Sequence, residues 1–274
     1  MLADVVWLLR CPTCGGTLDL SAGALRCNEN HTFDVARQGY VNLLGGAAHG
    51  SADTVAMVQA RDAFLGAGHY EPLSNLVTEA VGDGDGPVFE IGAGTAYYLA
   101  AALDARPRSV GLALDISVPA SRRAARAHPR LGAVVADAWS ALPVVDGCAE
   151  AVLVVFAPRG PAELARVLRP GGRLVVLTPA PQHLTELVGV LGLLGVDERK
   201  SERLHAALGP AFDVVDEVAL SHAMRLTTGD VGHLAAMGPS AFHTSADDLR
   251  RRAVGLPEVV EVTAAVTVTT FRRR

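Results

Sequence analysis

The sequence lacks the features that mark membrane, secreted and broadly basic proteins. No run of about 18 uninterrupted apolar residues occurs, which argues against a membrane-spanning helix. The first residues include an acid, Asp4, and contain neither a cationic leader nor an A-x-A cleavage site, so we expect a cytoplasmic protein that does not bind a membrane. The net charge of -5 excludes a broad basic field, and any contact with nucleic acid must therefore be local.

Cysteine is also scarce, with four residues in 274. A chain of this length without a secretory signal has no need of a disulfide scaffold. Half of the residues are hydrophobic, which is enough for one large core with a small additional unit. We expect one α/β domain with an appended module.

Three of the four cysteines lie near the start of the chain together with a histidine. Cys11, Cys14, Cys27 and His31 have the spacing C-x2-C-x12-C-x3-H, which is typical of a tetrahedral zinc site. The residues between the two pairs predict a short β-hairpin that turns at Ser21–Gly23 and is too small for a core of its own. Four protein ligands leave no open position, so we expect the zinc to be structural. A redox pair or reduced structural cysteines are the alternatives.

Residues 88–98, with the sequence VFEIGAGTAYY, predict a strand, a glycine turn and the start of a helix. Gly92 and Gly94 would let the backbone approach a ligand closely, and the amides at the helix start would offer hydrogen-bond donors. A second strand over 109–114 ends at Asp115, about 20 positions later, where a carboxylate can accept hydrogen bonds from ribose hydroxyls. These features predict a ribose-bearing cofactor.

The glycine pattern also indicates which cofactor. A dinucleotide fingerprint would need a third glycine where Tyr97 stands, so a nicotinamide dinucleotide is the weaker reading. Glu90 directly precedes the first glycine, and the pattern E/D-x-G-x-G resembles that of methyltransferases that use S-adenosylmethionine (SAM).

The later strands follow the same plan. Residues 131–135 predict a third strand, followed by Asp137, and the apolar run 151–156 predicts a strand that is buried on both faces in a parallel sheet. Ligands of such sheets lie beyond the carboxyl ends of the strands, so we expect Phe156 to face the reacting groups. Two further strands, over 212–220 and 259–271, predict an antiparallel pair at the end of the chain.

An ordered set of motifs resembles the bacterial large-subunit (23S) ribosomal RNA guanine-N1 methyltransferases, a family that includes members conferring tylosin-type macrolide resistance. The resemblance covers about the first two thirds of the chain. The matching pieces are the zinc-ligand module, F-D-x-A-x-x-G-Y-V-N-L-L over 33–44, Arg61, 63–65, Gly68-His69-Tyr70, Pro72-Leu73, 90–98, 114–117, 156–158, 166–172, Pro179, Pro181 and His183-Leu184.

The resemblance implies a Rossmann-like class I SAM methyltransferase domain, with a mostly parallel sheet and an antiparallel C-terminal strand, plus a zinc-binding N-terminal module. It places Tyr70 and His183 at the methionine end of SAM and Asp137 at the adenine amino group. Packing of Tyr70 in the core, and a capping or surface role for His183, are the alternatives. The residues that we expect to bind SAM are Tyr70, Glu90, Gly92, Gly94, Thr95, Asp115, Ile116, Asp137, Phe156 and His183.

The chain departs from the family pattern at four positions. Thr95-Ala96 replaces an acid-glycine pair, and Glu90 replaces an aspartate. Asp62 stands where the family often has a second arginine, so if that position touches phosphate in relatives, it cannot do so here. Arg122, Arg123 and Arg126 on the predicted helix after Asp115 are read first as a solvated face and second as RNA contacts.

We therefore predict a zinc-binding RNA-recognition module over 1–44, a mobile linker over 45–54 and a methyltransferase domain over 55–274. The predicted reaction transfers a methyl group from SAM to N1 of a guanine in a hairpin of 23S ribosomal RNA. The sequence identifies no catalytic base and leaves a homodimer open. A SAM-dependent small-molecule methyltransferase and a non-catalytic zinc RNA-binding protein are the alternative functions.

Overall fold

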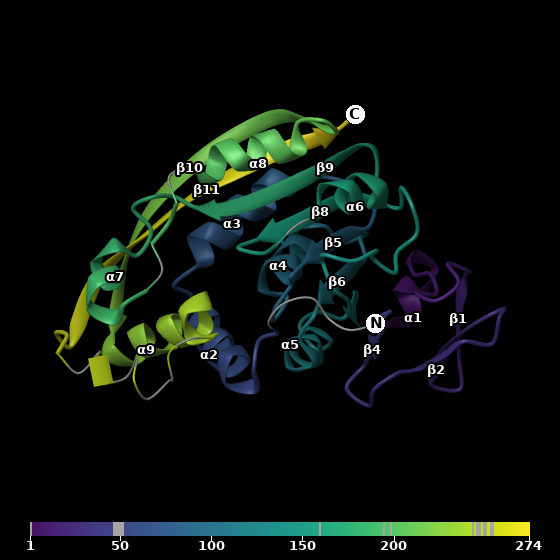
Figure 1. Cartoon of the computed structure of the whole chain (residues 1–274), viewed down its shortest axis with the longest axis horizontal. Helices are drawn as coiled ribbons and strands as arrows, with labels where there is room; N and C mark the ends of the chain where they lie inside the picture. Colours follow the sequence, from purple (N-terminus) through teal and green to yellow (C-terminus); the bar gives the residue numbers. More distant parts are fainter. Residues whose placement is uncertain are drawn as a thin grey trace.

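An eight-stranded sheet forms the centre of the molecule in the computed structural model, which describes residues 2–45, 52–158, 160–193, 195–197, 199–242, 244, 248, 251–252 and 255–274 (Figure 1). The strand order is β10-β11-β9-β8-β5-β6-β7-β4. The strands are β4 (Tyr40–Asn42), β5 (Val88–Ile91), β6 (Gly111–Asp115), β7 (Leu131–Val135), β8 (Ala149–Val155), β9 (Leu168–Pro179), β10 (Phe212–Thr227) and β11 (Val259–Arg273). The six strands from β4 to β9 are parallel, whereas β10 and β11 are antiparallel additions, as predicted.

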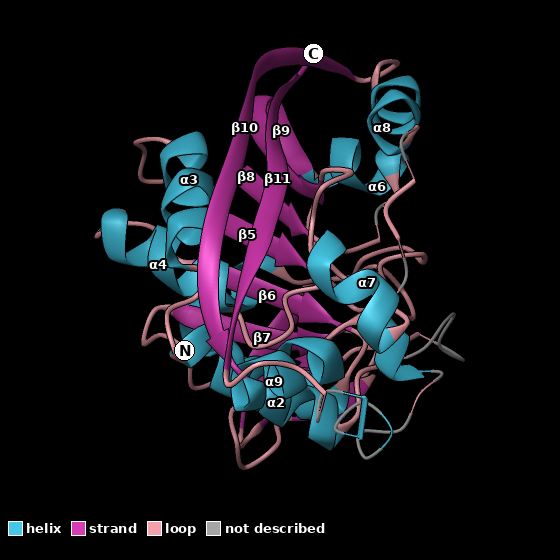
Figure 2. Ribbon diagram, turned by 90° about the vertical axis from the view of Figure 1, so that its left-hand side faces the viewer, coloured by secondary structure: helices cyan, strands magenta, loops and turns pink. Residues whose placement is uncertain are grey.

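Helices cover both faces of this sheet (Figure 2). One hydrophobic cluster joins the sheet to α2 (Val55–Gly66), α3 (Glu71–Val81), α4 (Tyr97–Ala105), α5 (Val118–Ala124), α7 (Thr185–Leu191) and α9 (Thr228–Met237). A second cluster on the opposite face joins it to α1 (Leu2–Val5), α6 (Pro161–Val167), α8 (Lys200–Leu208) and the N-terminal module. Successive residues of β8 alternate between the clusters, because side chains of a strand point to opposite faces. This burial on both faces confirms the reading of β8 as an inner strand.

Local signals set several element ends. The Thr54 hydroxyl accepts a hydrogen bond from the Met57 N–H at the start of α2. The Ser117 hydroxyl caps α5 in the same way, with a proline in the first turn. The segment 169–172 is part of β9, where the register against β8 shifts, and α7 begins at Thr185, so His183 lies in the turn before that helix.

The N-terminal module holds a separate three-stranded antiparallel sheet of β1 (Leu18–Ser21), β2 (Ala24–Cys27) and β3 (Thr32–Asp34). Ala22 and Gly23 both have positive φ and form the tight turn between β1 and β2, which confirms the predicted hairpin. A short 3-10 helix, η1 (Val6–Leu8), precedes the metal ligands.

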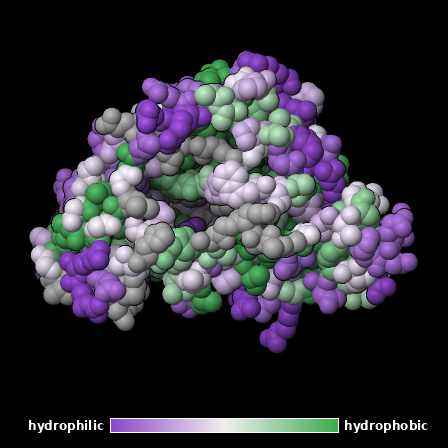
Figure 3. Space-filling view, viewed as in Figure 1, coloured by the Kyte–Doolittle hydropathy of each residue, from purple (hydrophilic) through white to green (hydrophobic). Residues whose placement is uncertain are grey.

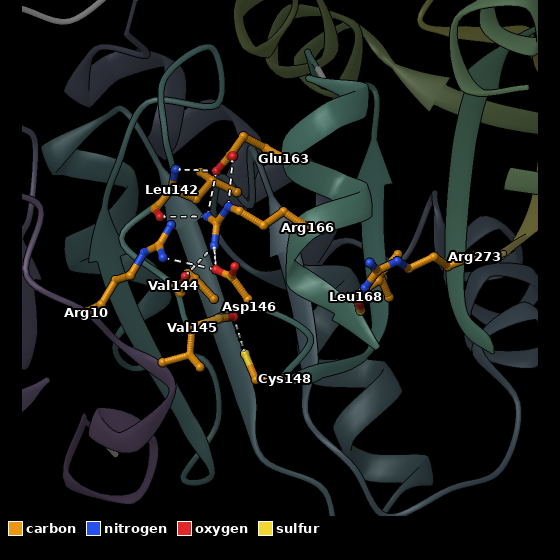
Figure 4. Close-up of polar contacts among 10 residues, drawn as sticks. All are labelled: Arg10, Leu142, Val144, Val145, Asp146, Cys148, Glu163, Arg166, Leu168 and Arg273. Carbon is orange, nitrogen blue, oxygen red and sulfur yellow. Dashed lines mark hydrogen bonds and ion pairs between the residues drawn. The ribbon is translucent and has the colours of Figure 1, made fainter. Parts of the chain in front are cut away.

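The module is docked against the larger part of the chain. Leu9 forms an antiparallel bridge with Val144, and the Arg10 N–H donates to the Pro143 carbonyl at 3.1 Å. The Arg10 guanidinium also pairs with Asp146 at 3.0 Å, and Asp146 in turn pairs with Arg166 of α6 (Figure 4). The N-terminal segment thus covers the connection between β7 and β8, which carries no helix.

The predicted domain boundary crosses this arrangement. β4 belongs to the predicted module by its position in the chain, yet it pairs in parallel with β7 of the large sheet. The predicted linker over 45–54 falls largely on 46–51, which lie outside the described residues, so its mobility stays a prediction. Among the described residues, no helix has the length and apolar character needed to cross a membrane.

Candidate functional site

The glycine turn after β5 is built for close approach of backbone and ligand. Gly92 and Gly94 have φ values of +68° and +54°, in the left-handed region that favours glycine. A Cβ added to Gly92 would lie 2.5 Å from the Cβ of Ala157, in the loop after β8. The Gly92 N–H donates to the carbonyl of Leu114 at 2.8 Å and so ties the turn to the tip of β6.

Three carboxylates lie at the ends of three neighbouring strands, and each accepts backbone N–H groups. Glu90 in β5 accepts from the N–H of Leu99 at 3.1 Å. Asp115, at the end of β6, accepts from the N–H groups of Gly94 at 2.7 Å and Ser117 at 2.8 Å. Asp137, after β7, accepts from the N–H of Trp139 at 2.9 Å. Because a carboxylate offers about four acceptor positions, Asp115 can accept further hydrogen bonds from a ligand besides those from its two N–H donors.

Burial raises the pKa of two of these acids. It raises the pKa of Glu90 to about 8, although the hydrogen bond from Leu99 acts in the opposite direction. Burial also raises the pKa of Asp115, against the lowering effect of the two N–H donors. A cation or a set of hydroxyl groups bound beside these side chains would relieve the cost of their burial.

Aromatic side chains form another wall of the site. The hydroxyl of Tyr70 lies 3.4 Å from Nε2 of His183, and the two ring centroids are 6.4 Å apart. The Phe156 ring lies 5.6 Å from that of His183 and 6.3 Å from that of Tyr70. Phe156 has a φ of +51°, an unusual value for a bulky residue, and its side chain is 42% exposed. Burial raises the pKa of Tyr70, so its hydroxyl stays neutral.

These walls enclose a cavity of about 840 Å³ at the carboxyl ends of the strands, and Figure 3 shows a hollow in this face of the molecule. Nine of the ten residues predicted to bind SAM line it: Tyr70, Glu90, Gly92, Thr95, Asp115, Ile116, Asp137, Phe156 and His183. The tenth, Gly94, lies outside the lining and donates to Asp115 instead. The structure therefore brings the predicted residues to one place, while their contacts with SAM remain a proposal.

The cavity also contains residues to which the sequence assigned no role. Arg61 of α2 pairs with Asp53 at 2.7 Å and donates to the carbonyl of Met237, at the end of α9, at 2.9 Å. The β10–β11 ribbon extends beyond β9 and carries α9 to this position against α2. Arg61 was part of the matching motifs, but its contact with α9 joins segments 176 residues apart and has no local signal.

The predicted metal ligands form one cluster in the N-terminal module. Ligand atoms of Cys11, Cys14, Cys27 and His31 all lie within 4.8 Å of one another. The sulfurs of Cys14 and Cys27 are 3.6 Å apart, and Nδ1 of His31 lies 3.3 Å from the sulfur of Cys27. A zinc ion with Zn–S distances of 2.3 Å requires sulfurs about 3.8 Å apart, so the cluster fits tetrahedral zinc. Cys148 lies elsewhere and donates to the carbonyl of Val145.

Comparison with known proteins finds relatives of the N-terminal module and of nearly the whole chain. Residues 9–49 match the zinc ribbon family described as "RlmA, N-terminal". The chain is 49% identical over 277 residues to the 23S rRNA (guanine(748)-N(1))-methyltransferase of Streptomyces fradiae, with 99% of each chain covered. It is 47% identical over 293 residues to a putative 23S rRNA (guanine-N(1)-)-methyltransferase of Micromonospora griseorubida, again with 99% of each chain covered.

Solved structures show the same fold at low sequence identity. The putative methyltransferase complex with the Haloferax volcanii Trm112 activator superposes with a TM-score of 0.55 and 16% identity, over 81% of this chain and 99% of that chain. The YcgJ protein of Bacillus subtilis gives a TM-score of 0.52 and 16% identity, over 74% of this chain and 99% of that chain. These likenesses support the fold alone.

Proposed function

Because the chain belongs to the family of 23S rRNA (guanine-N1)-methyltransferases, we propose that it transfers a methyl group from SAM to N1 of one guanine in a hairpin of 23S ribosomal RNA. The observation that carries this proposal is the identity over nearly the full length of the Streptomyces fradiae enzyme. The cavity supports it, because the residues expected at SAM meet there at the carboxyl edge of the sheet.

The residues present fit SAM. Asp115 accepts two backbone N–H groups and can also accept hydrogen bonds from ribose hydroxyls, and Asp137 lines the cavity where a carboxylate suits an exocyclic amine such as that of adenine. Glu90 and Tyr70 both line the cavity, and we propose that their carboxylate and phenol hold the ammonium group of the methionine part. The glycine turn provides the space, since a side chain at Gly92 would collide with Ala157.

SAM supplies an activated methyl group on its sulfonium. The chain itself must hold the acceptor in line with that group and exclude water, and most of the acceleration expected from such a site comes from positioning. Guanine N1 lies on the Watson–Crick edge, so the base must be unpaired or turned out of its helix to reach the cavity. Phe156 is exposed at the cavity and can lie against the face of such a base.

The zinc ribbon holds the N-terminal module together and offers a second surface for the RNA. Its four protein ligands leave zinc no position for water, so the ion has a structural role. The module is fixed to the methyltransferase part through Arg10 and Asp146, which keeps it at a constant place relative to the cavity. We propose that this rigid pairing, in the cytoplasm where ribosomal RNA is found, selects one hairpin.

Primer extension on 23S ribosomal RNA tests the function. RNA incubated with the purified protein and SAM should give a new stop one nucleotide before a guanine, because N1-methylation blocks base pairing. Asp115→Asn protein serves as the matched control and should give a much weaker stop. An unchanged pattern with the unsubstituted protein, together with methyl incorporation into a metabolite extract, would instead favour a small-molecule methyltransferase. Light scattering on the same preparation tests for a homodimer.

A further inference from the structure

Exposed aromatic side chains are concentrated around the cavity. Among the described residues, the aromatic side chains that are exposed are Trp7, Trp139, Phe156 and Phe242. The last three all line the cavity, from the loop after β7, the loop after β8 and the 3-10 helix η2 (Pro239–Phe242) respectively. Trp139 is 61% exposed and, as part of the cavity lining, presents an aromatic ring to whatever the cavity binds.

Trp139 is held in place by its backbone. Its N–H donates to Oδ1 of Asp137 at 2.9 Å, and the N–H of Ser140 donates to the Asp137 carbonyl at 3.1 Å. Asp137 is itself only 5% exposed. The turn is therefore fixed from below by a buried acid, while the indole faces outward without a neighbouring aromatic ring among the described residues.

The position of Trp139 connects the cavity with the zinc ribbon. Four residues further along, the carbonyl of Pro143 accepts a hydrogen bond from Arg10, which directly precedes the zinc ligand Cys11. Four residues span at most about 14 Å. Trp139 therefore belongs to the short segment that links the cavity lining to the residues on which the N-terminal module docks.

We propose that Trp139 stacks on the nucleotide next to the target guanine, while Phe156 stacks on the guanine itself. This inference rests on the proposed function and adds a binding site for a second base of the substrate. Aromatic faces bind unpaired bases by stacking, and proteins recognise RNA loops largely in this way. An indole ring in the cavity lining, stacked on the neighbouring nucleotide, would hold the strand in register, so that the correct base enters.

The two tryptophans of the chain allow a direct test. In Trp7→Phe protein, Trp139 is the sole source of indole fluorescence. A transcript of the hairpin mapped by primer extension should quench this fluorescence, because a stacked base contacts the ring. A transcript that is abasic at the neighbouring nucleotide should quench it far less. Equal quenching by both transcripts, or no quenching by either, would overturn the proposal.

A second outcome would assign the ring to the cofactor. If S-adenosylhomocysteine without RNA quenches Trp139 as strongly as the transcript does, the indole covers the adenine and the stacking proposal is wrong. This result is separate from failure of the proposed function, which is judged by whether the unsubstituted protein methylates the RNA at all.

Steady-state kinetics give an independent measurement. Trp139→Ala should raise the KM for the hairpin about tenfold and leave the KM for SAM unchanged, since loss of one base–aromatic stack weakens only RNA binding. Trp139→Phe should restore most of the affinity. Trp7→Ala is the matched control, because Trp7 is similarly exposed, at 58%, but does not line the cavity. A raised KM for SAM, or equal effects of the two alanine variants, would contradict the proposal.

Discussion

The carboxylate of Asp115 accepts a hydrogen bond of 2.7 Å from the backbone N–H of Gly94, which joins the tip of β6 to the glycine turn after β5. The same carboxylate accepts the N–H of Ser117 at 2.8 Å. One side chain thus fixes the turn, the start of α5 and the ribose end of the proposed SAM site. Its substitution should affect cofactor binding more than any exposed acid does.

Asp115→Asn should weaken SAM binding between about tenfold and a hundredfold, because a charged acceptor is replaced by a neutral group that also turns an amide toward the donors. Isothermal titration with SAM measures the change. Asp85→Asn is the control, since Asp85 is exposed and pairs with Arg108 away from the cavity. If both variants bind SAM as the unsubstituted protein does, Asp115 does not hold the ribose.

Gly92→Ala should destabilise the protein more than Gly147→Ala. Both glycines have similar φ values, +68° and +61°, so each substitution carries about 1–2 kcal/mol of backbone strain. A Cβ at Gly92 also meets Ala157 at 2.5 Å, whereas a Cβ at Gly147 meets no atom within 4 Å. Overpacking should add about 1–3 kcal/mol at Gly92, measured as the free energy of unfolding in urea. Equal losses of unfolding free energy in the two variants would show that the loop after β8 moves aside for the added methyl group at no cost.

Glu90 should make stability depend on pH. Its pKa is about 8 in the folded chain, raised from an ordinary value of 4.5 by burial, so between these limits the folded state binds more protons than the unfolded state. The free energy of unfolding should therefore fall as the pH rises through this window, by at most about 1.4 kcal/mol per pH unit, and level off above it. In Glu90→Gln protein this contribution disappears.

Urea unfolding of the two proteins at several pH values across that window measures the difference between them. Glu79→Gln serves as a control, because Glu79 is exposed on α3 and should leave the pH dependence as it is. Parallel curves for Glu90→Gln and the unsubstituted protein would mean that Glu90 titrates near its ordinary pKa when folded.

We expect substitution of a clustered cysteine to remove zinc and substitution of Cys148 to leave it bound. Cys14→Ala removes one of four zinc ligands, so the purified protein should hold well under one equivalent of zinc and lose the fold of the ribbon. Cys148→Ala should keep about one equivalent and change stability by about 1 kcal/mol or less, since its thiol makes one hydrogen bond to Val145. Elemental analysis and thermal unfolding measure both. Full zinc content in Cys14→Ala protein would exclude it as a ligand.

Local patterns carried most of the sequence-based predictions. The zinc ligands span only 21 residues, and each strand tip with its acid is a single short motif, so spacing alone located them. Contacts between segments that are far apart in the sequence have no such local motif. The pairing of Arg10 with Asp146 and the bond from Arg61 to Met237 join residues more than a hundred positions apart. The helix α9 lies at the cavity because it follows β10, which forms a long antiparallel pair with β11.

The sheet to which β4 belongs could not be predicted from its position in the sequence. A strand that precedes the glycine turn in the chain was assigned to the zinc module, but in space it is the outermost strand of the large sheet. A three-residue strand gives no periodic signal strong enough to show which sheet it joins.

Because β4 belongs to the large sheet, the N-terminal module cannot be removed without removing a strand of that sheet. A fragment starting after residue 54 would lose β4 and the cover over one sheet face, leaving the flank of β7 open to chance pairing with other chains. Grafting the ribbon of another relative would require exchanging a piece of the catalytic sheet as well. We therefore expect differences in RNA specificity among these relatives to arise from substitutions of single residues, and not from exchange of the whole N-terminal module.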